Sequence, residues 1–195
     1  ISWNEDNKTT INLTSYVWNP NNNELDFYIY ATSDEEYISI DSIENGTVSF
    51  SSEKDWNGED WIVFLIIDRQ TYLETNEITL TVNPVNDAPE FQEQIANITW
   101  NEDTNLTNYL DLNDYFYDVD TNELTFSVLG NIFVNVILNN DLVSFYPQKD
   151  WFGSEIIKFR ASDNEYETES NEIRLTVNNL NEPPEFGLID CQAEI

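Results

Sequence analysis

The stretch that decides the fold is N-E-I-T-L-T-V-N-P-V-N-D-A-P-E-F, Asn76 to Phe91. Ninety-five residues later the chain reads N-E-I-R-L-T-V-N-N-L-N-E-P-P-E-F, Asn171 to Phe186. In each copy an alternating apolar and polar run is followed by a polar segment that contains proline. The alternation has a period of two, which predicts a strand with one buried face. Because proline cannot donate to a sheet ladder, the segment after each strand is predicted to be a linker.

The repetition extends beyond this stretch and predicts a duplicated domain. Aligned without a gap, residues 54–91 and 149–186 are identical at 19 of 38 positions. Two further motifs recur in the same order: I-S-W-N-E-D at Ile1–Asp6 returns as I-T-W-N-E-D at Ile98–Asp103, and K-D-W-N-G at Lys54–Gly58 returns as K-D-W-F-G at Lys149–Gly153. The period of 95–99 residues is that of a whole domain, since solenoid units repeat every ~20–50 residues.

Strand patterns fill each repeat, and helical periodicity of any length is missing. In the second repeat, residues 124–128, 157–162 and 173–177 all alternate apolar with polar side chains. Short strands separated by turns are typical of a Greek-key β-sandwich with an Ig-like architecture. We therefore expect an all-β chain with two tandem sandwich domains, at residues 1–85 and 86–180, and a linker or the start of a following segment at 181–195.

Four of the six tryptophans recur at equivalent positions, Trp3 with Trp100 and Trp56 with Trp151. We predict that all four anchor the cores, because both copies keep them beside strand or turn residues. Stacking on a sugar is the alternative that the sequence leaves open.

One strand differs between the copies. Residues 61–67, W-I-V-F-L-I-I, are apolar on both faces. The outward positions in the phase of the second repeat are Val63, Leu65 and Ile67, where the second repeat has Lys158, Arg160 and Ser162. Three apolar residues on a nominally wet face indicate either cover from a loop or neighbouring strand, or a contact patch.

The composition restricts the partners of the chain. Its 195 residues carry a net charge of −31, with 38 acids against 7 bases, and 40% are hydrophobic, which suffices for packed cores. No basic footprint exists for nucleic acid or for an anionic membrane surface. No run reaches the ~18–20 apolar residues of a membrane span, so no insertion of this segment is expected. Self-repulsion of this size must be offset by salt or by bound cations.

Three smaller observations set the context. The single cysteine, Cys191, excludes a disulfide within the chain. No signal peptide is present. The chain opens directly inside the I-S-W-N-E-D motif, so we expect it to be a segment of a longer protein.

Acidic residues gather at particular loops. Asp118 and Asp120 precede the run that begins at Leu124, and Asp163 ends the run at 157–162. Successive loops of a sandwich meet at its two ends, so these carboxylates are expected to share a pole. Ca²⁺ accepts six to eight oxygen ligands in flexible geometry, which suits such a pole. An EF-hand is excluded, because Glu123 stands at the position that needs glycine. Acids that only solvate the loops are the alternative.

Together these motifs resemble cadherin-like tandem repeats, in the version common in large bacterial and archaeal surface proteins and adhesins. The resemblance rests on V-N-D-A-P-E-F at 85–91, the Asp-x-Asp before a strand, the Asn/Phe-Gly turn and Ser162-Asp163, and it covers about residues 1–186. It implies two cadherin-like domains with Ca²⁺ at their junction. The ligands that it implies are Glu5 and Asp55 from the first domain, Asn83, Asn86 and Asp87 from the linker, and Asp118, Asp120 and Asp163 from the second.

The resemblance also implies half-sites at the outer poles, and the sequence departs from the family in two places. The outer acids and amides are Asp68 at one pole and Glu102, Asp150, Asn181 and Glu182 at the other. The first repeat has Asn19-Pro20-Asn21 where the second has Asp118-Val119-Asp120, which puts a full site at the amino-terminal pole in doubt. With one clear acid, Asp87, the linker is expected to hold fewer ions than eukaryotic cadherin linkers.

A structural role is the predicted function. We expect a non-catalytic segment of an extracellular, cell-surface protein, with a calcium-stiffened stalk serving adhesion or surface structure. Its predicted partners are neighbouring domains of the same parent protein, with homophilic or surface-glycan contacts as further options. A carbohydrate- or ligand-binding module that uses aromatics such as Tyr28 and Tyr30 is the alternative. An enzyme is disfavoured, because the chain has no histidine and no catalytic centre stands out between two near-equal copies.

Five Asn-x-Ser/Thr sequons predict possible N-glycosylation: Asn7, Asn12, Asn45, Asn97 and Asn105.

Overall fold

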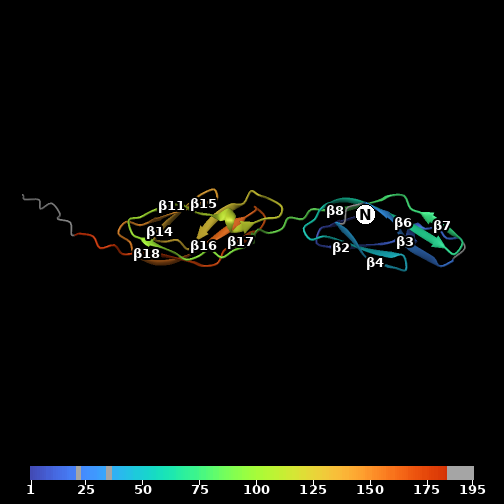
Figure 1. The fold of residues 1–195 in the computed structure, drawn as a ribbon, viewed down its shortest axis with the longest axis horizontal. Coiled ribbons are helices and arrows are strands. Elements are labelled where there is room, and N and C mark those ends of the chain that lie inside the picture. Colours follow the sequence, from blue (N-terminus) through green and yellow to red (C-terminus); the bar gives the residue numbers. More distant parts are fainter. Residues whose placement is uncertain (21–22, 34–36, 184–195) are drawn as a thin grey trace, which may run out of the picture. The chain divides into compact units, whose positions relative to one another are not determined.

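The computed structural model describes residues 1–20, 23–33 and 37–183 (Figure 1). The chain divides into two compact units, of which unit 1 comprises Ile1–Asn86 and unit 2 begins at Asp87. The predicted segment at 181–195 falls mostly on residues 184–195, outside the described residues, as do Cys191 and Asn21.

Unit 1 is a β-sandwich of a five-stranded and a three-stranded sheet. The five-stranded sheet has the order β1 (Ser2–Asn4), β8 (Ile78–Asn83), β6 (Gly58–Asp68), β3 (Leu25–Thr32), and β7 (Thr71–Glu74) also pairs with β6. The three-stranded sheet has the order β2 (Lys8–Asn12), β5 (Thr47–Ser52), β4 (Ile38–Glu44). The 3-10 helix η1 (Leu13–Tyr16) follows β2. Strand β1 runs parallel to β8 and the other pairs are antiparallel.

Unit 2 repeats this plan and adds a two-stranded sheet. Its five-stranded sheet has the order β10 (Ile98–Asn101), β18 (Ile173–Asn178), β16 (Gly153–Ser162), β13 (Thr125–Leu129), and β17 (Glu167–Glu169) also pairs with β16. Its three-stranded sheet has the order β11 (Leu106–Asp111), β15 (Leu142–Pro147), β14 (Val134–Asn139). The 3-10 helix η2 (Leu112–Asp114) follows β11, and β9 (Glu90–Phe91) pairs with β12 (Phe116–Tyr117). The predicted all-β chain of two tandem sandwiches is confirmed.

Alternation builds both cores, as the sequence predicted. In β16, Ile157, Phe159 and Ala161 are buried, while the residues between them are half-buried or exposed. The outward residues of β6 that the sequence singled out, Val63, Leu65 and Ile67, are half-buried.

The four recurring tryptophans pack against the cores. Trp3 and Trp100 are each only 7% exposed. Trp56 and Trp151 are half-buried against the core clusters, stacked on Tyr37 and Phe133 with ring centroids 5.1 Å apart in both pairs. The prediction of core anchors is therefore confirmed.

The glycine of each Trp-x-Gly turn lets the tryptophan ring lie against the backbone. A Cβ atom on Gly58 would come within 2.8 Å of the Trp56 ring, and one on Gly153 within 3.1 Å of the Trp151 ring. Only glycine avoids both contacts, which explains why the motif recurs. The turn also positions the aspartate that precedes each tryptophan.

Candidate metal sites at the ends of the sandwiches

The glutamate of the W-N-E-D motif is buried in both units. Glu5 is 2% exposed and Glu102 is 5% exposed. The main-chain N–H of Glu5 donates to the Asn83 carbonyl at 3.0 Å, and its Oε1 accepts the Val85 N–H at 2.5 Å. The equivalent two bonds hold Glu102 in unit 2. Each glutamate therefore fastens the first motif to the segment that leaves the last strand.

The aspartate after each buried glutamate belongs to the same end, although the sequence analysis did not select it. Asp6 and Asp103 have φ angles of 57° and 59°, and Asp55 and Asp150 have φ angles of 56° and 57°. Aspartate tolerates this left-handed conformation better than most residues. In unit 1 the Asp55 N–H donates to Asp6 Oδ1 at 3.1 Å. The available signal was the strict recurrence of Glu-Asp in both motifs.

Three carboxylates converge at the carboxyl-terminal end of unit 2. One carboxylate oxygen from each of Asp103, Asp150 and Glu182 lies within 4.8 Å of the others, and all three residues are exposed. Lys149 Nζ approaches Asp150 Oδ2 at 3.7 Å, between two exposed side chains. We call these three acids the carboxylate cluster.

Crowding in the carboxylate cluster perturbs Glu182. A hydrogen bond with Asp103 raises the pKa of Glu182, and the negative charges of Asp103, Asp150 and Glu102 raise it further. A carboxyl group whose pKa is raised by neighbouring carboxylates marks a place where a bound cation would relieve repulsion. Of the predicted outer residues, Asp150 and Glu182 therefore meet, and Asn181 is exposed next to Glu182.

At the amino-terminal end of unit 2, the carboxylate of Asp118 is buried and held by main-chain hydrogen bonds, as expected of a metal ligand. It is 3% exposed, and its Oδ1 accepts the N–H groups of Asp120 and Thr121 at 2.9 and 3.1 Å. Its Oδ2 is buried without a hydrogen-bond partner among the described residues. A buried carboxylate oxygen costs free energy unless a donor or cation pairs with it.

The other predicted ligands of unit 2 lie at the same end but are less tightly grouped. The Asp87 N–H donates to Asp120 Oδ2 at 2.7 Å. Asp163 directly follows Ser162, which pairs with Thr125 at the start of β13. Asp163 Oδ1 accepts the N–H groups of Glu165 and Tyr166 in the same turn. Among the residues that the structure describes, Asp118, Asp120 and Asp163 do not form a group of three carboxylates within 4.8 Å.

The predicted ligands of unit 1 occupy its carboxyl-terminal end. Asp55 Oδ2 pairs with Lys54 at 2.7 Å, whereas Asp55 Oδ1 is buried and unpartnered within the described ranges. Asn83 donates through Nδ2 to the Trp3 carbonyl at 3.1 Å. Asn86 is half-buried at the end of the unit.

The amino-terminal end of unit 1 lacks the counterpart of Asp118. The Asn19 amide there donates to the Asn23 carbonyl at 2.7 Å. Asp68, the counterpart of Asp163, accepts the N–H groups of Gln70 and Thr71. These bonds, that from Gln70 foremost, lower the pKa of Asp68. The amides at 19 and 23 add no charge to this end.

All five sequon asparagines are exposed. Asn12 caps η1 by accepting the Thr14 N–H at 3.0 Å, and Asn97 Oδ1 accepts the Arg174 N–H at 2.8 Å. Asn45 has a φ of 51°. Their modification stays a prediction.

The fold and the acid-rich ends define a class, that of tandem β-sandwich modules. Residues 85–178 match the family model of the cadherin-like domain. The second repeat is a cadherin-like domain, and the first repeats it in sequence motifs and strand order.

Solved structures with similarity to the chain include a protocadherin and a glycoside hydrolase. Domains EC1-2 of human mucin-like protocadherin are 12% identical, with 80% of this chain and 85% of that chain covered and a TM-score of 0.46. An endo-fucoidan hydrolase of glycoside hydrolase family 107 is 20% identical over 82% of this chain, with a TM-score of 0.37. This chain spans only 24% of that hydrolase. A search of curated proteins finds no match. No helix in the described part of the chain is long and apolar enough to cross a membrane.

Proposed function

We propose that this chain is a non-catalytic, calcium-binding spacer of a cell-surface protein, in which Ca²⁺ at the ends of each sandwich stiffens the connection between consecutive domains. The observation that carries the proposal is the carboxylate cluster of unit 2, where Asp103, Asp150 and Glu182 lie within 4.8 Å of one another. The first repeat has acids at the same sequence positions, Asp6, Asp55 and Asp87. A linker between two such domains would therefore be supplied with ligands from both sides.

The donor set fits a hard cation. It contains carboxylate, amide and carbonyl oxygens without histidine or cysteine, which favours Ca²⁺ over transition metals. The residues that would hold ions are those of the carboxylate cluster, Asp103, Asp150 and Glu182, and the set Glu5, Asp6, Asp55, Asn83, Asn86, Asp87, Asp118, Asp120 and Asp163. The unpartnered Oδ atoms of Asp55 and Asp118 support this assignment. The bound ion would neutralise carboxylates that otherwise repel in a chain of net charge −31.

An extracellular location follows from the same chemistry. Extracellular modules bind Ca²⁺ with a Kd of about 10⁻⁴–10⁻³ M, so a millimolar exterior would fill the sites and a cytosol would not. The exposed sequons are compatible with this location. The partners that the proposal requires are neighbouring domains of the same parent protein.

A calorimetric titration with Ca²⁺ tests the metal assignment. The double variant Asp118→Asn/Asp120→Asn should lose at least one binding event or bind about tenfold more weakly. The control Asp26→Asn/Glu44→Gln removes the same charge from exposed positions of unit 1 and should bind as the unchanged chain does. Equal binding by all three proteins would contradict the assignment.

Two exposed tyrosines support a second candidate function, binding of a carbohydrate. Tyr28 and Tyr30 on β3 are 50% and 57% exposed, and tyrosine rings stack on sugar faces. Affinity electrophoresis in gels that contain polysaccharide would test this role. Retardation that Tyr28→Ala/Tyr30→Ala abolishes would support it, and unchanged mobility on every polysaccharide would reject it.

A further inference from the structure

The segment that leads into unit 2 docks into its sandwich at two points. The first is Phe91 in β9, whose ring centroid lies 5.1 Å from that of Phe116 in β12. Next to it, the Gln92 N–H donates to the Tyr115 carbonyl at 2.9 Å. Phe91 packs against the core cluster of unit 2.

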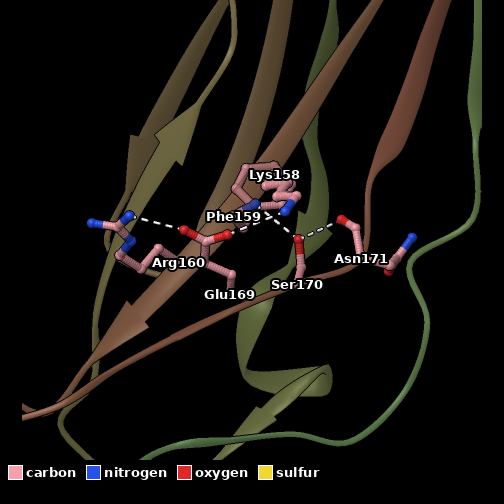
Figure 2. A network of polar contacts seen from close by, with 6 residues as sticks. All are labelled: Lys158, Phe159, Arg160, Glu169, Ser170 and Asn171. Atoms are coloured by element: carbon pink, nitrogen blue, oxygen red, sulfur yellow. Dashed lines mark hydrogen bonds and ion pairs between the residues drawn. The ribbon is translucent and has the colours of Figure 1, made fainter.

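The second point is Ile95, which an asparagine clamps in place. Ile95 is 2% exposed and belongs to the core cluster. The Ile95 N–H donates to Asn171 Oδ1 at 2.9 Å, and Asn171 Nδ2 donates to the Ile95 carbonyl at 3.0 Å. Figure 2 shows Asn171 beside Ser170, whose hydroxyl accepts the Phe159 N–H. The side chain of Asn171 thus makes the two hydrogen bonds to the Ile95 main chain that a neighbouring strand would otherwise make.

Unit 1 has the same clamp residue without this segment. Asn76 is the counterpart of Asn171, and Thr75 Oγ1 accepts the Phe64 N–H at 3.0 Å, as Ser170 does for Phe159. Asn76 is exposed, and its one hydrogen bond within the described residues runs from Nδ2 to the Glu77 carbonyl. Helices η1 and η2 start after equivalent caps, so Tyr16 corresponds to Tyr115.

Two pockets in unit 1, one of them mainly apolar, lie at the positions that correspond to these two points. A pocket of about 490 Å³ is lined by residues that include Ile1, Leu13, Ile66, Asn76 and Ile78. Their counterparts in unit 2 are Ile98, Leu112, Ala161 and Ile173, which belong to the same core cluster as Ile95, and Asn171, which clamps Ile95.

The other pocket, of about 200 Å³, is lined by residues that include Val17, Trp18 and Leu25. Their counterparts are Phe116 and Tyr117, which pair with β9, and Leu124 in the core cluster. Around the two pockets the exposed fractions are 78% for Tyr16, 85% for Trp18 and 54% for Leu73.

We propose that these two pockets bind an extended peptide segment with an aromatic residue and, four positions later, a branched aliphatic residue, and that this segment leads directly into Ile1 in the same chain. The direction is set by Ile1, whose amino group donates to the Thr79 carbonyl at 2.8 Å and whose carbonyl accepts the Thr81 N–H at 2.8 Å. Strand β1 thus runs along β8 as β10 runs along β18. A residue three positions before Ile1 would lie at Asn76.

Charge favours a segment of the same chain over one from a second copy. Each copy carries −31 charges, which opposes close approach of two copies. In unit 2 only Ala96 and Asn97 separate Ile95 from Ile98, so docking in cis needs no long loop. The docked segment would fix the register of the linker on the sandwich, a role that involves no metal and is independent of the proposed function.

An extended form of the full chain tests this proposal. The segment E-F-Q-E-Q-I-A-N, a copy of residues 90–97, is placed before Ile1, and the matched control carries serine in place of its Phe and Ile. Hydrogen exchange with a chelator present is followed over residues 11–18 and 64–78. We expect exchange there to slow by at least about tenfold with the segment, and not with the serine control. Equal exchange in the two proteins would overturn the proposal.

Further variants test the asparagine clamp, and a free peptide tests whether the bound segment must belong to the same chain. Asn76→Ala in the extended chain should lose most of the slowing over residues 64–78, and Asn171→Ala should speed exchange over 93–97 in unit 2. Unchanged exchange in both variants would reject the asparagine clamp. Binding of the free acetylated octapeptide to the unextended chain, with no protection from the fused segment, would reject the assignment in cis.

Discussion

The outer faces of the two five-stranded sheets differ sharply although they occupy the same place in the fold. In unit 2, Arg160 pairs with Glu167 at 2.8 Å. Glu169 pairs with Arg160 at 2.9 Å and with Lys158 at 3.2 Å (Figure 2). The carboxylate of Glu169 therefore bridges two cations on β16.

In unit 1 the same face is apolar. Val63 and Leu65 stand where unit 2 has Lys158 and Arg160, and both are half-buried. The register sets Tyr28 opposite Leu65, and Tyr72 opposite Ile67. Inward positions do not differ in this way, since Phe64 and Phe159 correspond and both are fully buried. Duplication has therefore preserved what faces the core and what lies at the acidic ends, while the outer sheet face has changed.

The largest effect is expected where the two units agree. Phe64→Ala and Phe159→Ala each remove a fully buried ring and should lower the free energy of unfolding of their own unit by about 3–5 kcal/mol. Denaturant unfolding followed by hydrogen exchange resolves the two units. A loss of unfolding free energy in one unit several times that in the other would contradict the equivalence of the two buried positions.

The second-largest effect is expected at a position where the two units differ. Glu155 is 9% exposed and accepts three main-chain N–H groups, those of Ile132, Phe133 and Val134, at 2.9–3.0 Å. Glu155→Ala leaves these donors without a partner, which should cost unit 2 about 2–3 kcal/mol.

Asp60, the counterpart of Glu155 in unit 1, is the matched control. Within the described residues it accepts only the N–H of the adjacent Trp61. Asp60→Ala should therefore cost less than about 1 kcal/mol. Equal losses for Asp60→Ala and Glu155→Ala in denaturant melts would show that the two acids have the same role.

A pH titration should sharpen the assignment of the carboxylate cluster. The neighbours of Glu182 raise its pKa above 4.5, so its contribution favours the folded state at pH below 4.5 and is lost as pH rises through the folded value. Asp103→Asn removes the hydrogen bond and charge that act most strongly, so the pKa of Glu182 should fall toward its ordinary value. Carboxyl chemical shifts by NMR measure this change, and an unmoved midpoint would reject the coupling.

The smallest effect concerns the outer faces themselves. Arg160→Ala should lower the melting temperature of unit 2 slightly at low salt and not at 1 M NaCl, because exposed ion pairs are screened. The change in melting temperature that Leu65→Ala causes in unit 1 should be the same at low salt and at 1 M NaCl. If Arg160→Ala lowered the melting temperature equally at low and high salt, the arginine would act by packing its aliphatic stem.

The sequence predicted the strands well because alternation in β13, β16 and β18 reports burial directly. It also placed the acids at the ends, since loop positions follow from strand order. It missed Asp6 and Asp103, because left-handed turn conformations that aim a carboxylate leave no periodic signal. The two pockets of unit 1 left no signal in the sequence either, because a pocket depends on how side chains pack in three dimensions.

The most direct test of the account is small-angle X-ray scattering of the full chain with Ca²⁺ and with a chelator, paired with the variant Asp118→Asn/Asp120→Asn. Calcium should make the particle longer and less flexible than it is in chelator, and the variant should lose most of this difference. Scattering curves that are identical with and without Ca²⁺ would contradict the proposal that calcium stiffens the connection between the two domains.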